Sequence, residues 1–335
     1  MLNTNDDSIV SKYNFISEKL TKYVGVCLDI LCLFGTTMNI LTFMRRTYKS
    51  RACSLYLLFA SICDFIHLNF GSLSNILQYG FHYDWTITSV AYCQIKNYFV
   101  YVFTIISATF TIFASIDRYI SSSRKVHCWI FSKQSIAIRC IIISILFWFI
   151  ISIPIIFCSI RIHHSSHNEQ MVCSINSKRM SCFFIQIVYS CILNGFIPPI
   201  SMLVFGLLTC INYRELRRRC PSDSSRVKQI NYQLTSMLVL QSIKSSFTSL
   251  PYSIFNTYAL LTIELDRSPM YQAKENLIHQ IVYLLFWSNY TSFFVYLYSS
   301  DIFRKHWLTH LKRIVCCLKL FKHQQSKYHI RSDRI

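Results

Sequence analysis

The chain of 335 residues has 53% hydrophobic and 16% aromatic side chains, whereas only 15% of its residues are charged. A soluble protein of this length usually carries about a quarter charged residues, so the composition excludes an ordinary soluble domain. The formal charge of +19 is spread over short tracts between apolar runs instead of one water-facing surface, which argues against a nucleic-acid partner. The sequence therefore predicts an all-α, polytopic membrane protein.

Seven apolar runs are long enough to cross a hydrocarbon layer of about 30 Å, which requires roughly 20 helical residues. The predicted spans are, in chain order, residues 22–44, 54–77, 92–121, 136–158, 182–211, 230–261 and 276–299. The sixth run is the most polar of the seven, because it contains Gln229, Gln233, Gln241 and Lys244. We expect these spans to form a seven-transmembrane helix bundle.

The basic residues predict how the bundle is oriented. The connections after the first, third and fifth runs and the C-terminal tail carry three times as many Lys and Arg residues as the opposite side. Basic residues in short loops favour the cytoplasm. We therefore expect an extracellular N-terminus over 1–21, a transmembrane domain over 22–299 and a cytoplasmic segment over 300–335, in the plasma membrane.

The segment after the seventh run has an amphipathic helical pattern. Residues 302–320 place apolar side chains at helical spacings among Lys and Arg residues. Such a helix is suited to an anionic inner leaflet, so membrane lipids are expected partners. Cys316 and Cys317 near its end are either palmitoylation sites or free thiols, and the sequence leaves both interpretations open.

The third run ends in Asp117-Arg118-Tyr119. An acid and an arginine are costly to place beside hydrocarbon, so this position is a candidate functional site. Cys93 lies 25 positions before Arg118, which corresponds to about 37 Å along a helix. The cysteine and the arginine are therefore predicted at opposite membrane surfaces.

Seven spans with Asp117-Arg118-Tyr119 at the inner end of the third resemble the rhodopsin-like (class A) G-protein-coupled receptors. The resemblance covers about residues 22–320, and the polar, aromatic outer third is similar to that of invertebrate neuropeptide receptors. In this family Asp117, Arg118 and Tyr119 contribute to G-protein coupling. The resemblance also implies a disulfide between Cys93 and Cys173, although two further cysteines at the same surface, Cys158 and Cys182, leave other pairings open.

The family's intramembrane polar site matches Asn39, Asp64 and Ser107, and the resemblance implies a sodium ion near Asp64. No other cofactor and no metal site built from His, Cys, Asp or Glu is expected. The chain also contains Lys244 in its sixth run. This lysine either faces Asp64 as an internal ion pair or extends toward the membrane interface, and the sequence does not decide between them.

Two family motifs are altered. Pro251 and Tyr296 remain as candidate switch residues. However, Ser249 stands where the family has a tryptophan, and Ser292 and Phe293 replace the asparagine and proline before Tyr296. No acid lies near Asn231, so we expect Asp117 alone to restrain Arg118.

Helical phase predicts a ligand pocket in the outer third of the bundle. Its candidate residues are Lys96, Asn97, Val100, Tyr101, Thr104, Tyr252, Asn256, His279 and Tyr283. Val100 occupies the position of the aspartate in amine receptors, and Phe286 that of the retinal lysine, so neither ligand class is expected. The loop around Cys173 is predicted to form a hairpin lid with a positive face. Alternatively, the tyrosines are interfacial belt residues and the loop histidines are solvated.

These features together predict a receptor and not an enzyme, because the spans lack a cluster of His, Asp and Glu side chains. The expected function is binding of an extracellular ligand, by the resemblance a peptide, and activation of a heterotrimeric G protein. The alternatives are a non-coupling decoy or scaffold receptor and, less favoured, a transporter. A transporter usually has paired repeats or Gly/Pro-broken helices, and the chain has only six glycines.

Overall fold

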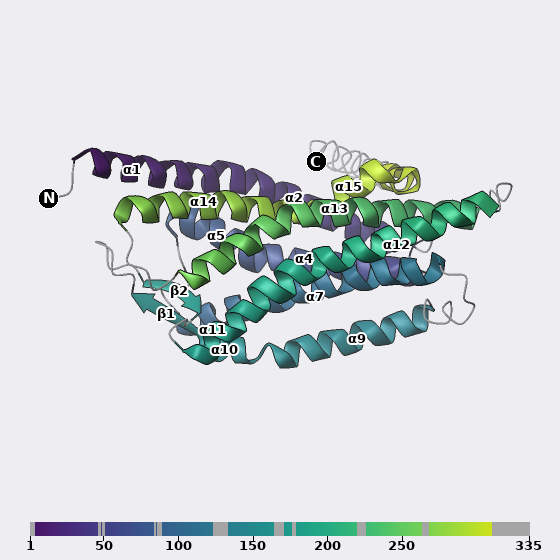
Figure 1. Cartoon of the computed structure of the whole chain (residues 1–335), viewed down its shortest axis with the longest axis horizontal. Helices are drawn as coiled ribbons and strands as arrows, with labels where there is room; N and C mark the ends of the chain where they lie inside the picture. The colour runs from purple at the N-terminus through teal and green to yellow at the C-terminus, as the bar shows by residue number, and fades with distance from the viewer. Residues whose placement is uncertain are drawn as a thin grey trace, which may run out of the picture.

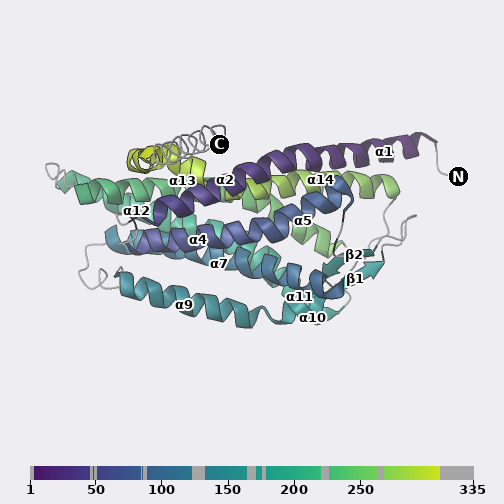
Figure 2. The same ribbon diagram turned by 180° about the vertical axis from the view of Figure 1, so that it is seen from behind.

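The computed structural model describes residues 4–45, 48, 51–83, 85, 89–122, 133–163, 171–175, 179–219, 226–262 and 268–309. These residues form a bundle of long helices along one common axis, with a short β hairpin at one end (Figures 1 and 2). The predicted seven-helix membrane bundle is confirmed. We call the end with the strands the hairpin end, and the opposite end, where Arg118 lies, the Arg118 end.

The first three spans are continuous helices, and the first two include wider, π-helical turns. Span one consists of α1 (Thr4–Lys19), the π-helical η1 (Leu20–Gly25) and α2 (Val26–Phe43). Span two consists of α4 (Ala52–His67), η2 (Leu68–Ser72), α5 (Leu73–Asn75) and η3 (Ile76–Gly80). Span three is the single helix α7 (Val90–Ser122).

The other four spans complete the bundle. Span four is α9 (Gln134–Ile151) followed by the short α10 (Pro154–Cys158). Span five is α11 (Met180–Gln186), the π-helical η5 (Ile187–Phe196) and α12 (Ile197–Arg219), and span six is α13 (Arg226–Leu261). Span seven is α14 (Pro269–Trp287), the 3-10 turn η6 (Ser288–Tyr290) and α15 (Ser292–Ser299).

Five of these spans are long and apolar enough by composition alone to cross a membrane, and the sixth and seventh are not among them. The polarity of α13 has a structural explanation, because Gln233 and Gln241 are buried inside the protein. The side chains that lower the hydropathy of this helix therefore face other helices. Span seven is divided at η6, and its longer part, the 19-residue α14, contains the charged Lys274 and Glu275 and the buried Gln280.

The bundle has apolar side chains outside and many polar side chains inside. Helix α9 is apolar all round and lies at the edge of the bundle, where Ile143 and Ile150 are 65% and 66% exposed. In contrast, Asn39, Ser61 and Gln280 are buried. Hydrocarbon provides no hydrogen-bond partners, so a membrane bundle must satisfy its polar groups internally.

The first helix extends well beyond the predicted span of 22–44. The part from Ser8 to Phe43 has 36 residues and is about 54 Å long, compared with a hydrocarbon thickness of about 30 Å. Helix α1 runs beside the start of α14 at the hairpin end (Figure 1). Hydropathy locates the part of a helix that lies in lipid, whereas a helix ends only where a breaker or cap ends it, so the sequence pattern underestimated this length.

The predicted hairpin is present in the connection between spans four and five. Strand β1 (Ser159–His163) pairs antiparallel with β2 (Met171–Ile175), and Arg161 is in register with Cys173. Two disulfides hold this end together, Cys93–Cys173 and Cys158–Cys182. The first ties β2 to α7, and the second joins the end of α10 to α11, so the hairpin is fixed on both sides.

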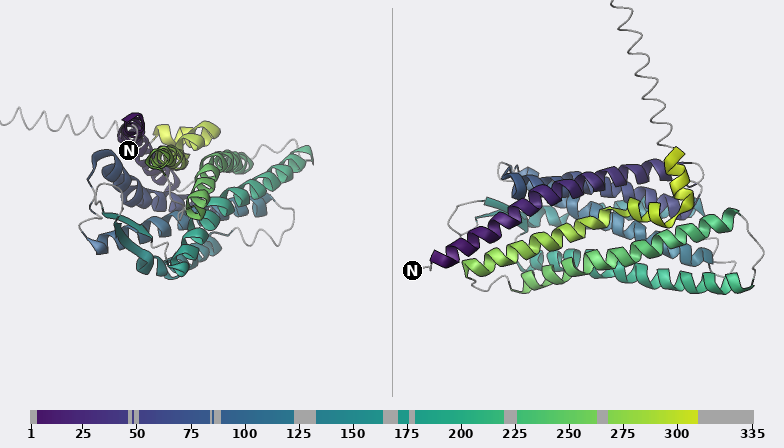
Figure 3. Two further views of the ribbon diagram at one scale, coloured as in Figure 1. Left: turned by 60° about the vertical axis from the view of Figure 1, so that its left-hand side comes forward. Right: turned by 90° about the horizontal axis from the view of Figure 1, so that it is seen from above.

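A short helix over residues 301–309 follows span seven and crosses the other helices at an angle (Figure 3). It corresponds to the start of the predicted amphipathic helix. Its anchor is Phe303, which is fully buried, whereas Arg304 on the other side of the helix is exposed. Cys316 and Cys317 lie outside the described residues, so their lipidation stays a prediction.

Helices of spans five and six approach closely at Gly195, and this contact yields a test of the packing. A Cβ atom at residue 195 would lie 2.0 Å from Ser253 Oγ, whereas one at Gly206 would meet its nearest neighbour, Val239, at 3.5 Å. We predict that Gly195→Ala destabilises the protein by about 1–3 kcal/mol through overpacking. The matched control Gly206→Ala, on the same span, should be neutral or slightly stabilising. Thermal unfolding of the two purified variants in detergent measures the difference, and equal melting temperatures would contradict this packing.

Candidate functional site

Arg118 and Asp117 form a buried ion pair at the end of α7. Arg118 donates to Asp117 Oδ2 from Nη2 at 2.5 Å and from Nε at 3.1 Å, and both residues are only 4% exposed. Hydrogen bonds between charged groups are roughly twice as strong as neutral ones. The third residue of the motif, Tyr119, packs on Phe205 of α12 with ring centroids 5.9 Å apart. Arg118 is therefore held against its own helix in this conformation.

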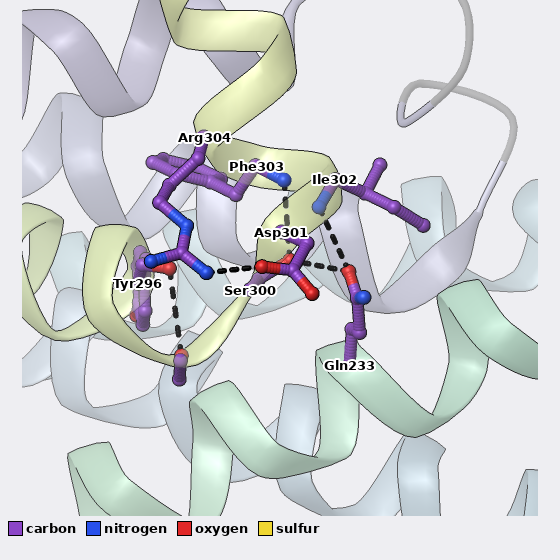
Figure 4. Close-up of polar contacts among 8 residues, drawn as sticks. Gln233, Tyr296, Ser300, Asp301, Ile302, Phe303 and Arg304 are labelled. Atoms are coloured by element: carbon purple, nitrogen blue, oxygen red, sulfur yellow. Dashed lines mark hydrogen bonds and ion pairs between the residues drawn. The ribbon is translucent and has the colours of Figure 1, made fainter.

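At the same end of the bundle, Gln233 of α13 connects span six to the final helix (Figure 4). Its side-chain oxygen accepts a hydrogen bond from Ser300 Oγ at 2.8 Å and another from the backbone N–H of Ile302 at 3.0 Å. Ser300 Oγ in turn accepts from the backbone N–H of Phe303 at 3.1 Å. The first N–H groups of a helix have no intrahelical partners, so Gln233 and Ser300 together cap the helix over 301–309. The sequence alone did not reveal this connection, although a glutamine within a predicted membrane span was a signal for it.

Tyr296, the candidate switch residue of span seven, is buried in an aromatic cluster. Its ring meets those of Phe43 and Phe303 with centroids 5.9 Å apart in both cases. Phe303 also contacts Phe293, and Tyr48 contacts Phe43, so rings from spans one and seven and the final helix pack together. Burial raises the pKa of the Tyr48 hydroxyl, so this ring remains neutral. The cluster packs the Tyr296 ring against span one and the final helix.

The two altered positions before Tyr296 both contact span one. Ser292 accepts a hydrogen bond from the side-chain amide of Asn39 at 3.0 Å. Phe293 packs beside Gly35, where a Cβ atom would lie only 3.2 Å from that of Phe293. Spans one and seven are therefore in contact at these two positions. Ser292 provides the hydrogen-bond acceptor in place of the family's asparagine, and Phe293 provides an apolar contact in place of the proline.

Span seven breaks at Ser288–Tyr290 without that proline. Ser288 Oγ donates to the carbonyl of Leu285 at 2.6 Å, and Thr291 Oγ1 donates to that of Ser288 at 2.7 Å. Such local bonds compete with helical hydrogen bonding. Side chains from other spans bind the carbonyls of the break. Cys32 Sγ contacts the carbonyl of Trp287 at 3.6 Å, and Lys244 Nζ donates to that of Asn289 at 3.1 Å.

The predicted intramembrane polar site is assembled in part. Ser107 of α7 donates a hydrogen bond to a carboxylate oxygen of Asp64. Both residues line a cavity of about 50 Å³ at the centre of the bundle, together with Gln241 and Asn289. Asn39 does not bind Asp64, because its amide is bonded to Ser292. The structure thus brings two of the three residues together.

A second, larger cavity of about 190 Å³ lies nearer the hairpin end. Seven of the nine predicted pocket residues line it, namely Lys96, Asn97, Val100, Tyr101, Thr104, Tyr252 and Tyr283. The other two, Asn256 and His279, are not among the lining residues. His279 stacks on Tyr283, with ring centroids 5.7 Å apart, so it supports the wall of the cavity from outside.

Span two contributes a wall that the sequence analysis missed. His67, Gly71 and Asn75 line the larger cavity, and their spacing of four residues is the helical signal that could have revealed them. Thr104 Oγ1 lies 2.8 Å from His67 Nδ1 and donates its own proton to the carbonyl of Val100 at 2.6 Å. A hydroxyl has one proton, so His67 Nδ1 must be the donor to Thr104. This fixes the histidine tautomer at the cavity wall.

Asn97 in the lining of the larger cavity contacts the hairpin, and aromatic rings form another part of the lining. Asn97 Nδ2 lies 3.3 Å from Ser159 Oγ and 3.4 Å from Cys173 Sγ, which connects α7 to both strands. Tyr252 stacks on Phe286, with centroids 4.5 Å apart, one residue after Pro251. Helix six therefore has an aromatic contact beside the cavity even though Ser249 replaces the family's tryptophan.

Comparison with known proteins agrees with this architecture. The family model described as 7 transmembrane receptor (rhodopsin family) matches residues 35–299, which is most of the chain. The match begins within α2 and ends with α15, so it includes Arg118 and both cavities. A comparison with curated proteins gives no significant match.

The contact between Ser107 and Asp64 provides a test of the polar site. We predict that Ser107→Ala lowers the stability of the protein by about 1–3 kcal/mol, because it leaves a buried carboxylate without its hydroxyl donor. Ser115→Ala is the matched control on the same helix, since Ser115 Oγ bonds only its own helix at the carbonyl of Thr111. Thermal unfolding in detergent measures both. If the two variants lose the same stability, Ser107 has no special role at Asp64.

Proposed function

Because the chain belongs to the rhodopsin family of seven-transmembrane receptors, we propose that it binds an extracellular peptide and activates a heterotrimeric G protein. The observation that carries this proposal is the buried pair of Asp117 and Arg118 at the end of α7. It lies at the opposite end of the bundle from the cavity beneath the hairpin, which is the arrangement that a signal across a membrane requires.

Coupling requires that Arg118 leave Asp117 and become accessible at its end of the bundle. In this proposal a bound ligand favours a conformation in which α13 swings away from α7 at the Arg118 end. Pro251 lies inside α13 and removes one helical hydrogen bond, which makes it a natural bending point. The C-terminal helix of a G-protein α subunit then occupies the space that α13 leaves and contacts Arg118.

The described residues suggest how the resting position of α13 is held. Residues 226–231 offer no acid to Arg118, so an ion pair between the third and sixth spans is replaced by the bonds of Gln233 to Ser300 and Ile302. Outward movement of α13 must break both bonds. We infer that Gln233 sets part of the basal equilibrium between the two conformations.

The larger cavity supports a peptide ligand. It combines hydrogen-bonding side chains, such as Asn97 and Asn75, with the rings of Tyr101, Tyr252 and Tyr283. Pockets that fix a polar ligand usually have a few placed polar groups in an aromatic setting. The antiparallel hairpin contacts Asn97 of this lining through Ser159 and Cys173. Lys96 in the lining favours a ligand with an acidic or carbonyl-rich end.

The distribution of basic residues supports a plasma-membrane receptor with its N-terminus and hairpin outside and its C-terminal segment in the cytoplasm. In this orientation the disulfides Cys93–Cys173 and Cys158–Cys182 lie on the oxidising side. The amphipathic helix after Ser300 lies on the side of the anionic inner leaflet.

A non-coupling receptor is the second candidate function. The observation that favours it is the altered switch, because Ser292 and Phe293 replace the family's asparagine and proline, and Tyr296 is packed within aromatic rings. Such a receptor would bind ligand and would not promote nucleotide exchange.

Exposure of receptor-expressing cells to a peptide library separates these candidates. We predict calcium or cyclic-AMP responses to at least one peptide, and loss of those responses in Arg118→Ala at unchanged surface expression. Arg304→Ala is the control, since Arg304 pairs with Asp301 on the exposed face of the final helix. Binding of a peptide without any response would favour the non-coupling receptor. A full response in Arg118→Ala would show that this residue is not required for coupling.

Removal of the Gln233 acceptor should raise basal activity. Gln233→Leu loses two hydrogen bonds, each worth about 0.5–1.5 kcal/mol, so we expect roughly a tenfold rise in ligand-independent nucleotide exchange. Gln233→Glu retains acceptor oxygens and should stay near the wild-type level. Exchange on a panel of G-protein α subunits in receptor-containing membranes measures both variants. Unchanged basal exchange in Gln233→Leu, together with responses to a peptide, would show that this contact does not restrain α13.

A further inference from the structure

Lys244 is a charged side chain in the middle of the sixth span. It lies about two helical turns before Pro251 in α13, far from either end of that 36-residue helix. Its ammonium is directed toward span seven, where it donates to the carbonyl of Asn289 at 3.1 Å. One turn earlier on the same helix, Gln241 approaches the side-chain oxygen of Asn289 at 3.5 Å. Of the two positions that the sequence allowed, the structure therefore selects the internal one.

Lys244 is connected to the cavity that contains Asp64 through its hydrogen-bond partner. Asn289, which accepts the hydrogen bond from Lys244, lines this cavity of about 50 Å³ together with Asp64, Ser107 and Gln241. Opposite charges attract each other over several ångströms in a medium of low dielectric constant. A lone charge inside a membrane bundle is costly, whereas two opposite charges in one polar cavity compensate each other. Asp64 and Lys244 therefore form a neutral unit.

The family resemblance implies a sodium ion at the cavity that Asp64 lines. A hard cation requires several oxygen ligands. Asp64 already accepts from Ser107, the amide of Asn39 is bonded to Ser292, and the carbonyl of Asn289 is bonded to Lys244. A fixed ammonium at this cavity also repels any second cation, and the repulsion is strong in a medium of low dielectric constant. Gln241 Oε1 and Asn194 Oδ1 in the same lining have no hydrogen-bond partner among the described residues, so what opposes a sodium ion here is the charge of the lysine and not a lack of oxygen ligands.

We propose that Lys244 is the resident cation of this polar cavity, the tethered counter-charge of Asp64 in the place of a sodium ion. It also ties span six to the break in span seven through the carbonyl of Asn289. A mobile ion can be exchanged with the solvent, but a lysine cannot leave. The stability of this protein is therefore independent of sodium, unlike that of a bundle that binds the ion at Asp64. This inference does not depend on the ligand or on G-protein coupling.

The first test uses sodium alone as the probe. The melting temperature of the full-length protein in detergent is measured in sodium chloride and in choline chloride at equal ionic strength. The expected result is the same melting temperature in both salts for the wild type. A sodium ion that binds only the folded state would raise it with sodium concentration. A rise for the wild type that disappears in Asp64→Asn would overturn the proposal.

The second test is a double-mutant cycle in choline chloride. Lys244→Met and Asp64→Asn each leave one buried charge without its partner, and each should lower the melting temperature by roughly 5–10 °C. The double variant removes both charges, so it should be more stable than the sum of the two losses predicts. Lys274→Met, at an exposed position of α14, is the control and should behave like the wild type.

The cycle remains informative if a single variant folds poorly. Recovery of expression in the double variant, relative to either single variant, then supports the pair in the same way. Strictly additive losses in the cycle would mean that Lys244 and Asp64 do not act on each other, and would overturn the proposal irrespective of the sodium result.

Discussion

The structure depends on the absence of hydrogen-bond partners in hydrocarbon. Each polar side chain within a span must find its partner inside the bundle, so polar residues determine which helix faces meet. The contacts between spans that do this are Asn39 with Ser292, Asp64 with Ser107, Lys244 with Asn289 and Gln233 with Ser300. Both the interior cavities and the burial of the polar sixth span follow from this constraint, while α9, which has few such groups, stays at the edge.

In span seven, the helix break that a proline causes in the family is produced by other side chains. The family breaks this helix with a proline, but Phe293 occupies that position here and packs against Gly35. The break nevertheless occurs at η6, because Ser288 and Thr291 bond the local backbone. The carbonyl of Asn289 is then available to Lys244. The loss of the proline and the presence of a lysine are thus parts of one arrangement.

At the Arg118 end, contacts other than an ion pair between the third and sixth spans hold the helices in place. Arg118 is bound to Asp117, and Gln233 connects α13 to the helix over 301–309. The aromatic rings around Tyr296 fix that helix against spans one and seven. In the proposed mechanism, movement of α13 is therefore coupled to the final helix and to the break in span seven, instead of to an ion pair between the third and sixth spans.

The sequence by itself determined the number of spans, the depth of Arg118 relative to Cys93 and the residues of α7 that line the larger cavity, because hydrophobicity and helical phase are local properties. It did not predict the full length of the first helix, the wall formed by His67 and Gly71, or the partners of Lys244. Those features depend on which helix faces meet, and many rotations of a helix satisfy the same local pattern. Only the tertiary structure decided between them, since a buried charge is acceptable solely where packing brings another span's carbonyl or counter-charge within reach.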